Sequence, residues 1–145
     1  MSFLLDTNVV SEWLKPRPDL HVTAWLAQIE EDAVFLSVVT LTELRYGIER
    51  MPRGRRRNRL DQWLAVELTD RFMGRIIPID DEVALACGHI LAEREAMGRP
   101  MEVMDAFIAA TARSIGLSLV TRNEADFAGT VADIVNPWVN PWAEG

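Results

Sequence analysis

The first eight residues constrain the fold of this chain more than any other stretch. The apolar run Phe3-Leu4-Leu5 ends abruptly at Asp6, and a Thr-Asn pair follows it. Such a run is typical of a buried parallel strand, and Thr and Asn suit the start of a helix. Asp6 is therefore expected at the carboxyl end of a strand, where open α/β sheets bind ligands. A role for Asp6 as only the cap of the following helix stays the alternative.

The pattern of a strand followed by a helix recurs along the chain. Short apolar runs predict further strands, and apolar residues at helical spacing predict the helices between them. This alternation indicates an α/β sandwich around a parallel sheet, and at 145 residues without a linker we expect a single domain, residues 1–145. The predicted strands are residues 3–5, 33–37, 76–79, 117–120 and 131–135, and Pro78 indicates an edge strand or a strand end.

Composition excludes several classes of protein. A lone cysteine, Cys87, excludes an internal disulfide and fits a reducing compartment. No apolar run approaches the ~20 residues of a membrane span, so we expect a cytoplasmic protein without a membrane partner. One cysteine and two histidines are too few for a soft-metal site. Motifs for Ser–His–Asp catalysis and Gly-rich phosphate loops are missing.

The net charge of −7 hides an uneven distribution of basic residues. Lys15 is the only lysine, and a short arginine-rich segment contains Arg53, Arg55, Arg56, Arg57 and Arg59. Arginine binds phosphate in a bidentate manner, so this segment is predicted to contact nucleic acid or an acidic partner. A solvated loop and helix start is the alternative.

Four carboxylates occupy equivalent positions relative to the predicted strands. Asp6 and Asp126 follow strands, and Glu43 lies in the first turn of a helix entered from a strand. Asp105 opens the most apolar helix, ahead of the fourth strand. Because a parallel sheet places its strand ends and the following helix starts at one edge, the four acids can converge. Helix capping is the alternative, and Thr40-x-x-Glu43 has the pattern of a capping box.

Converged carboxylates repel one another, and partial burial makes their ionisation harder still. A hard divalent cation resolves this conflict, since Mg²⁺ and Mn²⁺ take oxygen ligands and keep several waters. Such a site activates a water and stabilises the leaving oxygen of a phosphodiester. It also supplies the positive charge with which an acidic protein can hold RNA.

Four motifs in a fixed order carry a family resemblance. They read Leu-Leu-Asp6-Thr7-Asn8-Val, Ser37-x-x-Thr40-x-x-Glu43-Leu, Gly98-Arg-Pro-x-x-x-x-Asp105-x-x-Ile108-Ala-Ala-Thr111-Ala, and Val120-Thr121-Arg-Asn123-x-x-Asp126-Phe127. Together they resemble the PIN-domain ribonucleases and, more narrowly, the VapC toxins of bacterial toxin–antitoxin pairs. The Asp-Thr-Asn-Val-Val-Ser-Glu stretch and the terminal Asn-Pro-Trp are similar to the FitB branch.

The resemblance implies a Mg²⁺- or Mn²⁺-dependent endoribonuclease with a three-layer α/β/α sandwich and a central parallel sheet. It implies that the metal-site and catalytic acids are Asp6, Glu43, Asp105 and Asp126. The polar residues that orient ligands and water would be Thr7, Asn8, Thr121 and Asn123. Asn123 stands where some relatives have an acid, which leaves Asp126 as the fourth carboxylate.

The resemblance also implies partners. These are an RNA substrate, a second copy of the chain in a homodimer, and a cognate antitoxin whose tail would occlude the site, often by delivering an arginine. DNA would be reached only indirectly, through the antitoxin. The arginine-rich segment would flank the RNA path or meet an acidic antitoxin surface. Trp138 and Trp142 would close the sheet edge or extend a dimer contact, with core packing as the alternative for Trp138.

Two other kinds of protein share some of these features. A Mg²⁺-dependent phosphoacceptor or phosphatase-like domain also places acids at strand ends, but it relies on a lysine late in the chain. None follows Lys15, and an Asp-x-Asp signature is missing. A non-catalytic partner-binding α/β domain, in which the acids only cap helices, is the other alternative.

Overall fold

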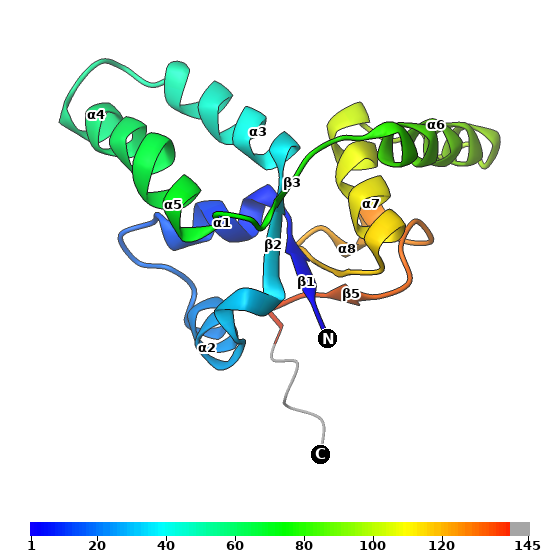
Figure 1. Ribbon diagram of the computed structural model, residues 1–145, viewed down its shortest axis with the longest axis horizontal. Helices are drawn as coiled ribbons and strands as arrows, with labels where there is room; N and C mark the ends of the chain where they lie inside the picture. The colour runs from blue at the N-terminus through cyan, green and yellow to red at the C-terminus, as the bar shows by residue number, and fades with distance from the viewer. Residues whose placement is uncertain (140–145) are drawn as a thin grey trace.

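A five-stranded sheet, parallel throughout, forms the centre of the molecule (Figure 1). The structure is a computed structural model that describes residues 1–139. The second Asn-Pro-Trp unit, with Trp142, lies outside the described residues. The strand order is β3-β2-β1-β4-β5, with β1 (Phe3–Leu5), β2 (Val34–Ser37), β3 (Ile76–Ile77), β4 (Ser118–Val120) and β5 (Ile134–Val135).

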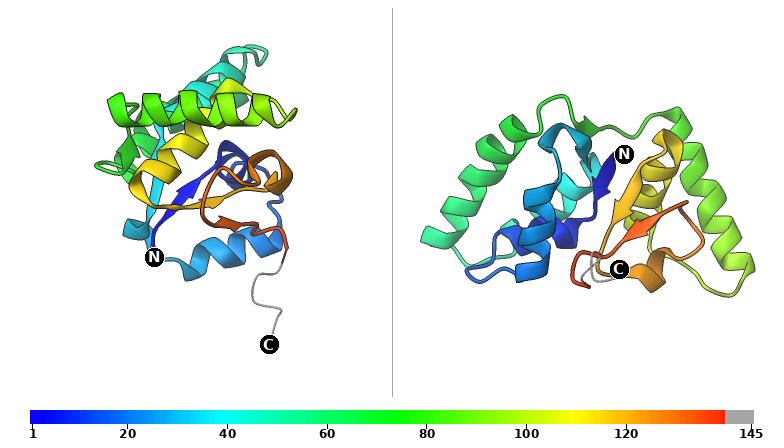
Figure 2. Two further views of the ribbon diagram at one scale, coloured as in Figure 1. Left: turned by 90° about the vertical axis from the view of Figure 1, so that its right-hand side faces the viewer. Right: turned by 90° about the horizontal axis from the view of Figure 1, so that it is seen from below.

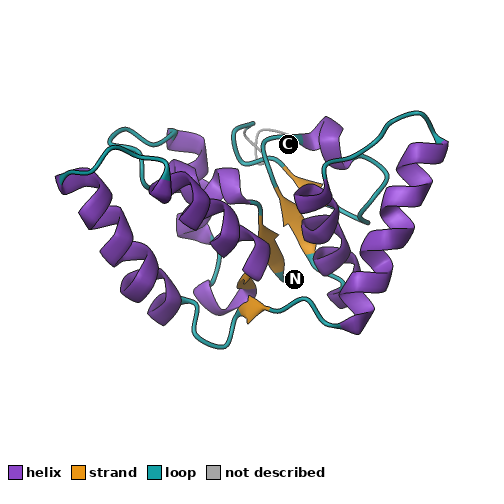
Figure 3. Ribbon diagram, turned by 90° about the horizontal axis from the view of Figure 1, so that it is seen from above, coloured by secondary structure: helices purple, strands orange, loops and turns teal. Residues whose placement is uncertain are grey.

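Helices cover both faces of this sheet, as the purple ribbons on either side of the orange strands in Figure 3 show. The three-layer α/β/α architecture expected from the sequence is thereby confirmed. In chain order, the helical elements are α1 (Thr7–Trp13), α2 (Leu20–Gln28), the 3₁₀ turn η1 (Glu31–Ala33), α3 (Val38–Glu49), α4 (Arg55–Gln62), the π-helical turn η2 (Trp63–Leu68), α5 (Thr69–Arg71), α6 (Asp81–Ala96), α7 (Val103–Ile115) and α8 (Glu124–Phe127).

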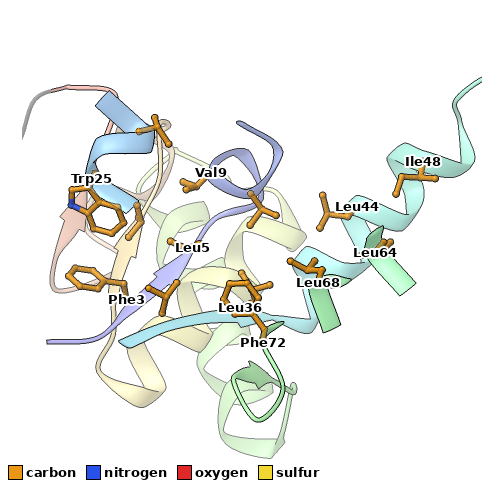
Figure 4. Packing of buried hydrophobic residues seen from close by; sticks show 14 residues of the cluster. Phe3, Leu5, Val9, Trp25, Leu36, Leu44, Ile48, Leu64, Leu68 and Phe72 are labelled. Carbon is orange, nitrogen blue, oxygen red and sulfur yellow. The ribbon is translucent and has the colours of Figure 1, made fainter. Parts of the chain in front are cut away.

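The alternation of side chains along β1 separates two hydrophobic cores. Phe3 and Leu5 belong to a core that also includes residues of α1, α2, α3 and η2 (Figure 4). Leu4 points to the other face, into a core built mainly from α6 and α7. Successive residues of a strand face opposite sides of the sheet, and here all three are buried. The central strand is therefore fixed between the two helical layers, and with it the position of Asp6.

Two groups of helices extend to either side of the sheet (Figure 2). One group contains α3 and the continuous helical stretch α4–η2–α5, and the other contains α6 and α7. The prediction from Pro78 is confirmed, because β3 is an edge strand. Within residues 1–139, no helix is both long and apolar enough to cross a membrane.

Several predicted element bounds were wrong by a few residues. The helix expected from Thr40 begins at Val38, because the Ser37 hydroxyl accepts a hydrogen bond from Val39 N (3.0 Å) and caps it earlier. The helix expected to begin at Asp105 begins at Val103. The strand expected over residues 131–135 is shorter, because only Ile134–Val135 (β5) pairs with β4.

Candidate active site

Asp6 lies at the point where β1 ends and α1 begins. Its backbone N–H still donates to Val120 O of β4 (2.9 Å). One carboxylate oxygen accepts from Thr7 N (2.8 Å) and the other from the Thr121 hydroxyl (2.8 Å). Asp6 therefore does cap α1, as the alternative interpretation held. The cap uses one oxygen, so the capping role and a role in a site are compatible.

Glu43 is not part of a capping box, which corrects that interpretation of the sequence. Because Ser37 caps α3, Glu43 falls in the second turn, where its carboxylate is free to reach another element. It accepts a hydrogen bond of 2.6 Å from the Thr7 hydroxyl, which also lies 3.1 Å from the Thr40 hydroxyl. Glu43 is thus held against the start of α1, beside Asp6, across 36 positions of sequence.

Asp105 lies in the first turn of α7 without capping that helix. Glu102 occupies the cap position and makes no side-chain capping bond. The rest of α7 is buried from Ala106 onward, except for its outer face, so the helix start is fixed by the core. Asp105 is half-buried, and no donor among the described residues bonds its carboxylate. Capping therefore does not explain this residue.

Three of the four predicted acids line one cavity of about 350 Å³ at the carboxyl edge of the sheet. Asp6, Glu43 and Asp105 come from the ends or starts of β1, α3 and α7. Parallel topology therefore brings together residues separated by up to 99 positions, from 6 to 105, as predicted. The other residues around the cavity are Thr7, Asn8, Ser11, Glu12, Lys15, Arg122, Asn123 and Trp138.

Three of the predicted polar residues, Asn8, Thr121 and Asn123, connect Asp6 and the start of α1 to the segment after β4. Besides its bond to Asp6, the Thr121 hydroxyl accepts from Asn123 N (3.0 Å). Asn8 makes longer contacts of 3.4 Å with the Thr121 hydroxyl and with Arg122 N. These bonds join the start of α1 to the segment after β4. The orientation of Asp6 is consequently set by two neighbouring strands.

Asp126, the fourth predicted acid, lies beside this cavity and does not line it. It is an exposed residue of α8 and lines a smaller hollow of about 120 Å³ together with Asp105. The hollow is bordered by Arg94, whose side chain is buried and donates to the carbonyl oxygens of Asp126 (3.0 Å), Arg99 (2.8 Å) and Ala128 (3.4 Å). Arg94 therefore fixes α8 relative to the segment that leads into α7.

Burial and mutual repulsion raise the pKa values of two of these acids. The pKa of Asp105 is raised to about 6, first by burial and then by the charges of Asp6, Glu43 and Asp126. The pKa of Asp6 is raised mainly by burial, against the lowering effect of the Thr121 hydrogen bond. Carboxyl groups that are costly to ionise together favour a bound cation. Within residues 1–139, no three His, Cys, Asp or Glu side chains lie close enough together, as they stand, to hold one metal ion directly.

Four charged or aromatic residues of the cavity, Glu12, Lys15, Arg122 and Trp138, were not predicted as parts of the site. Glu12 is buried, pairs with Lys15 (Oε1 to Nζ, 2.8 Å) and accepts from Asp19 N (2.9 Å). The hydrogen bond from Lys15 lowers the pKa of Glu12. Arg122 lies over the ring of Trp138, 5.3 Å from its centroid. Trp138 packs against the first core, so the core-packing interpretation is confirmed, yet it also borders the site.

None of the arginines of the arginine-rich segment lines this cavity. Arg57 bonds to Glu49 (2.8 Å) and to Met51 O (3.3 Å), which ties α4 to the end of α3, as does the ion pair between Arg45 and Asp61. Arg56 and Arg59 border a second cavity of about 520 Å³ whose apolar residues are Leu14, Pro16, Leu60 and Trp63. Part of the segment is thus structural, and part faces an amphipathic groove.

Comparison with known proteins agrees with this arrangement. Residues 3–131 match the PIN domain, and the chain belongs to the PIN-domain family. Within that family, it is 37% identical over 135 residues to the toxin FitB of Neisseria gonorrhoeae, covering 93% of this chain and 97% of FitB. It is 36% identical to the VapC ribonuclease Y4jK of Sinorhizobium fredii, covering 93% and 96%. The resemblance to VapC-type toxins of the FitB branch is therefore confirmed.

Solved structures give the same result. The crystal structure of FitAcB from Neisseria gonorrhoeae superimposes with a TM-score of 0.89 at 36% identity, over 94% of this chain and 99% of the other. A structure of FitAB bound to an IR36 DNA fragment matches with a TM-score of 0.88 at 34% identity, over 94% and 95%. The fold of this chain is thus that of the FitB toxin across nearly its whole length.

Proposed function

We propose that the chain is a Mg²⁺- or Mn²⁺-dependent endoribonuclease that serves as the toxin of a toxin–antitoxin pair. One observation carries the proposal: Asp6, Glu43 and Asp105 line a single cavity at the carboxyl edge of the sheet. The ribonuclease activity named for VapC relatives of the same fold supports it.

The residues present fit a hard divalent cation. All three acids offer oxygen ligands. The pKa values of Asp6 and Asp105 are raised first by burial and then by neighbouring carboxylates, and a bound cation would offset the cost of ionising both groups. Mg²⁺ is commonly held by one or two carboxylates and keeps several waters. A direct cluster of three carboxylates is therefore not required, and the remaining acids of the cavity can bind through those waters. Asp126, in the neighbouring hollow, is suited to a second ion or to a water-mediated contact.

Each residue of the site has a separate task in this proposal. The Thr121 hydroxyl and Thr7 N hold both oxygens of Asp6 in place. The Thr7 hydroxyl holds Glu43, so one short helix start orients two acids. When bound, the cation would make a water nucleophilic near neutral pH and stabilise the leaving oxygen of the phosphodiester. Asn8, Asn123 and Thr121 remain as the polar groups that order water around the acids.

Partners follow from the relatives. Relatives solved as FitAB with DNA and as VapBC complexes support a cognate antitoxin for this chain, with DNA reached through that antitoxin. We further propose a homodimer, which light scattering coupled to gel filtration would detect. Of the two uses of the arginine-rich segment, contact with the antitoxin is the better supported. Arg56 and Arg59 border the amphipathic groove, which shares no residue with the acidic cavity.

The test uses purified protein, a mixed tRNA and ribosomal RNA substrate, and a Mg²⁺ titration. Cleavage should require Mg²⁺ or Mn²⁺, should stop with EDTA, and should be lost in Asp6→Asn. Asp70→Asn removes an exposed acid of α5 that does not line the cavity, and should cleave as the wild type does. Metal-independent cleavage, or full activity of Asp6→Asn, contradicts the proposal. No cleavage at all, with intact antitoxin binding, supports the non-catalytic alternative.

A further inference from the structure

The acidic cavity also contains the one lysine of the chain and a stacked arginine. Lys15, Arg122 and Trp138, here termed the basic cluster, line it together with Asp6, Glu43 and Asp105. Neither the predicted site nor the role of the acids accounts for the basic cluster. In a chain of net charge −7, its position inside the acidic cavity needs its own explanation.

The Arg122 guanidinium lies over an aromatic ring and, among residues 1–139, has no anionic partner. Its guanidinium lies 5.3 Å from the centroid of the Trp138 ring, which in turn packs against the first core. Trp138 N donates to the side-chain oxygen of Asn136 (3.0 Å), so the backbone that carries the ring is also fixed. Among residues 1–139, Arg122 makes no ion pair. A guanidinium stacked in this way keeps the N–H groups at its edges free to donate.

Lys15 is oriented by a buried carboxylate. Its Nζ lies 2.8 Å from Glu12 Oε1, and Glu12 is only 4% exposed. The second oxygen of Glu12 accepts from Asp19 N (2.9 Å), so Glu12 itself is fixed. A lysine ammonium has three donors, and Glu12 accepts from one. The pair is close to neutral overall, which leaves Arg122 as the net positive charge of the basic cluster and Lys15 as an oriented donor.

We propose that Arg122 and Lys15 bind a backbone phosphate of single-stranded RNA beside the phosphodiester that is cleaved. The inference rests on the proposed ribonuclease function and identifies how substrate is held. Guanidinium groups match phosphate in a bidentate manner, and arginine with aromatic support is a common means of holding unpaired RNA. An arginine delivered by an antitoxin would pair with the acids of the same cavity, whereas phosphate is the group that Arg122 and Lys15 themselves are suited to bind. We therefore assign the basic cluster to the RNA backbone.

The test measures binding of a fluorescein-labelled single-stranded RNA of about 12 nucleotides in EDTA, by fluorescence anisotropy over a range of salt concentrations. Loss of one phosphate contact lowers the slope of log Kd against log salt by about 0.7. The ratio of Kd between about 200 and about 50 mM salt should therefore be about 2.6-fold smaller in Arg122→Gln than in the wild type. Arg122→Lys should keep the wild-type slope, because it keeps the charge.

A second variant is expected to strengthen RNA binding, a result that misfolding would not produce. Glu12→Gln removes the counter-charge of Lys15 while its amide oxygen can still accept from Asp19 N, so RNA binding should become tighter and its salt slope steeper. Arg113→Gln is the matched control, since Arg113 is an exposed arginine in the last turn of α7, whereas the cavity lies at its first turn. It should bind as the wild type does.

The outcomes separate the two proposals. If both Arg122→Gln and Glu12→Gln bind RNA with the wild-type slope of log Kd against log salt, the basic cluster is not a phosphate site. That result leaves the nuclease proposal intact. The nuclease proposal is tested separately, by measuring whether RNA cleavage is lost in Asp6→Asn. A wild type that binds no RNA, with or without Mg²⁺, overturns both.

Discussion

The Asp105→Asn substitution tests the repulsion among the acids most sharply, because no donor within residues 1–139 bonds the Asp105 carboxylate. The pKa of Asp105 is about 6 in the folded protein, against 3.8 for an unperturbed carboxyl. One pKa unit corresponds to about 1.4 kcal/mol, so ionised Asp105 destabilises the metal-free fold by at most about 3 kcal/mol. Because the group is half-buried, screening by water reduces this to about 1–2 kcal/mol.

The sign of the pH dependence follows from the raised pKa. Between about pH 4 and pH 6 the folded state binds more protons at Asp105 than the unfolded chain does, so wild-type stability falls as pH rises through that window. The asparagine variant lacks this titration. It should match the wild type near pH 4 and exceed its free energy of unfolding by about 1–2 kcal/mol at pH 7.5.

Urea unfolding in EDTA, followed by circular dichroism at both pH values, measures the difference. Asp70→Asn serves as the control, and its effect should be the same at both pH values. Addition of Mg²⁺ should raise the stability of the wild type by mass action and have a smaller effect on Asp105→Asn. An asparagine variant that is less stable than the wild type at pH 7.5, or a difference that does not change with pH, refutes the reasoning.

Other substitutions test the remaining parts of the site. Asp6→Asn should abolish RNA cleavage. Its metal-free stability should equal or exceed that of the wild type, because the amide oxygen still accepts from Thr7 N. If the variant instead loses the ~1 kcal/mol typical of a helix cap and still cleaves RNA, Asp6 serves only as a helix cap. Thr7→Val removes the donor to Glu43 and should lower cleavage about 10–100-fold, with a weaker apparent affinity for Mg²⁺; an unchanged Mg²⁺ titration would contradict this. Arg94→Met leaves the carbonyl oxygens of Arg99, Asp126 and Ala128 without this donor and should cost about 1–3 kcal/mol in thermal or urea unfolding. Arg113→Met should cost less than about 0.5 kcal/mol.

Much of the site was predictable because a parallel α/β sheet imposes a simple geometry. Once Phe3-Leu4-Leu5 is recognised as a buried strand, Asp6 must lie at its carboxyl end, and the same argument places Glu43 and Asp105 near the starts of α3 and α7. The structure brings these three to one cavity. The hydrophobic pattern and the parallel topology together therefore predict which edge of the sheet holds the candidate site.

Local hydrogen bonding was less predictable. Ser37 and Thr40 are both suited to cap a helix, and the pattern of apolar residues does not decide between them. The choice of Ser37 moves Glu43 out of the first turn and turns an apparent capping residue into a partner of Thr7. Asp126 presents a similar difficulty, because the short helix α8 places it in the hollow beside Asp105, and Asn123 lines the cavity in its place.

The basic cluster was not predictable from any single motif. Lys15 enters the cavity because a loop follows α1 and because the buried Glu12 holds its ammonium group. Arg122 and Trp138 meet only because β4 and β5 are neighbours in the sheet. The i, i+3 spacing of Glu12 and Lys15 and the uniqueness of that lysine were the available signals.

A crystal structure with Mn²⁺ tests the central claim most directly, because manganese is located by its anomalous scattering without reference to activity. We predict an anomalous peak in the cavity, bonded to a carboxylate oxygen of Asp6 and to at least one of Glu43 and Asp105, and its loss in crystals of Asp6→Asn. Two results would contradict the account. One is a cavity that contains only water in crystals soaked in millimolar Mn²⁺, and the other is manganese bound only elsewhere on the molecule.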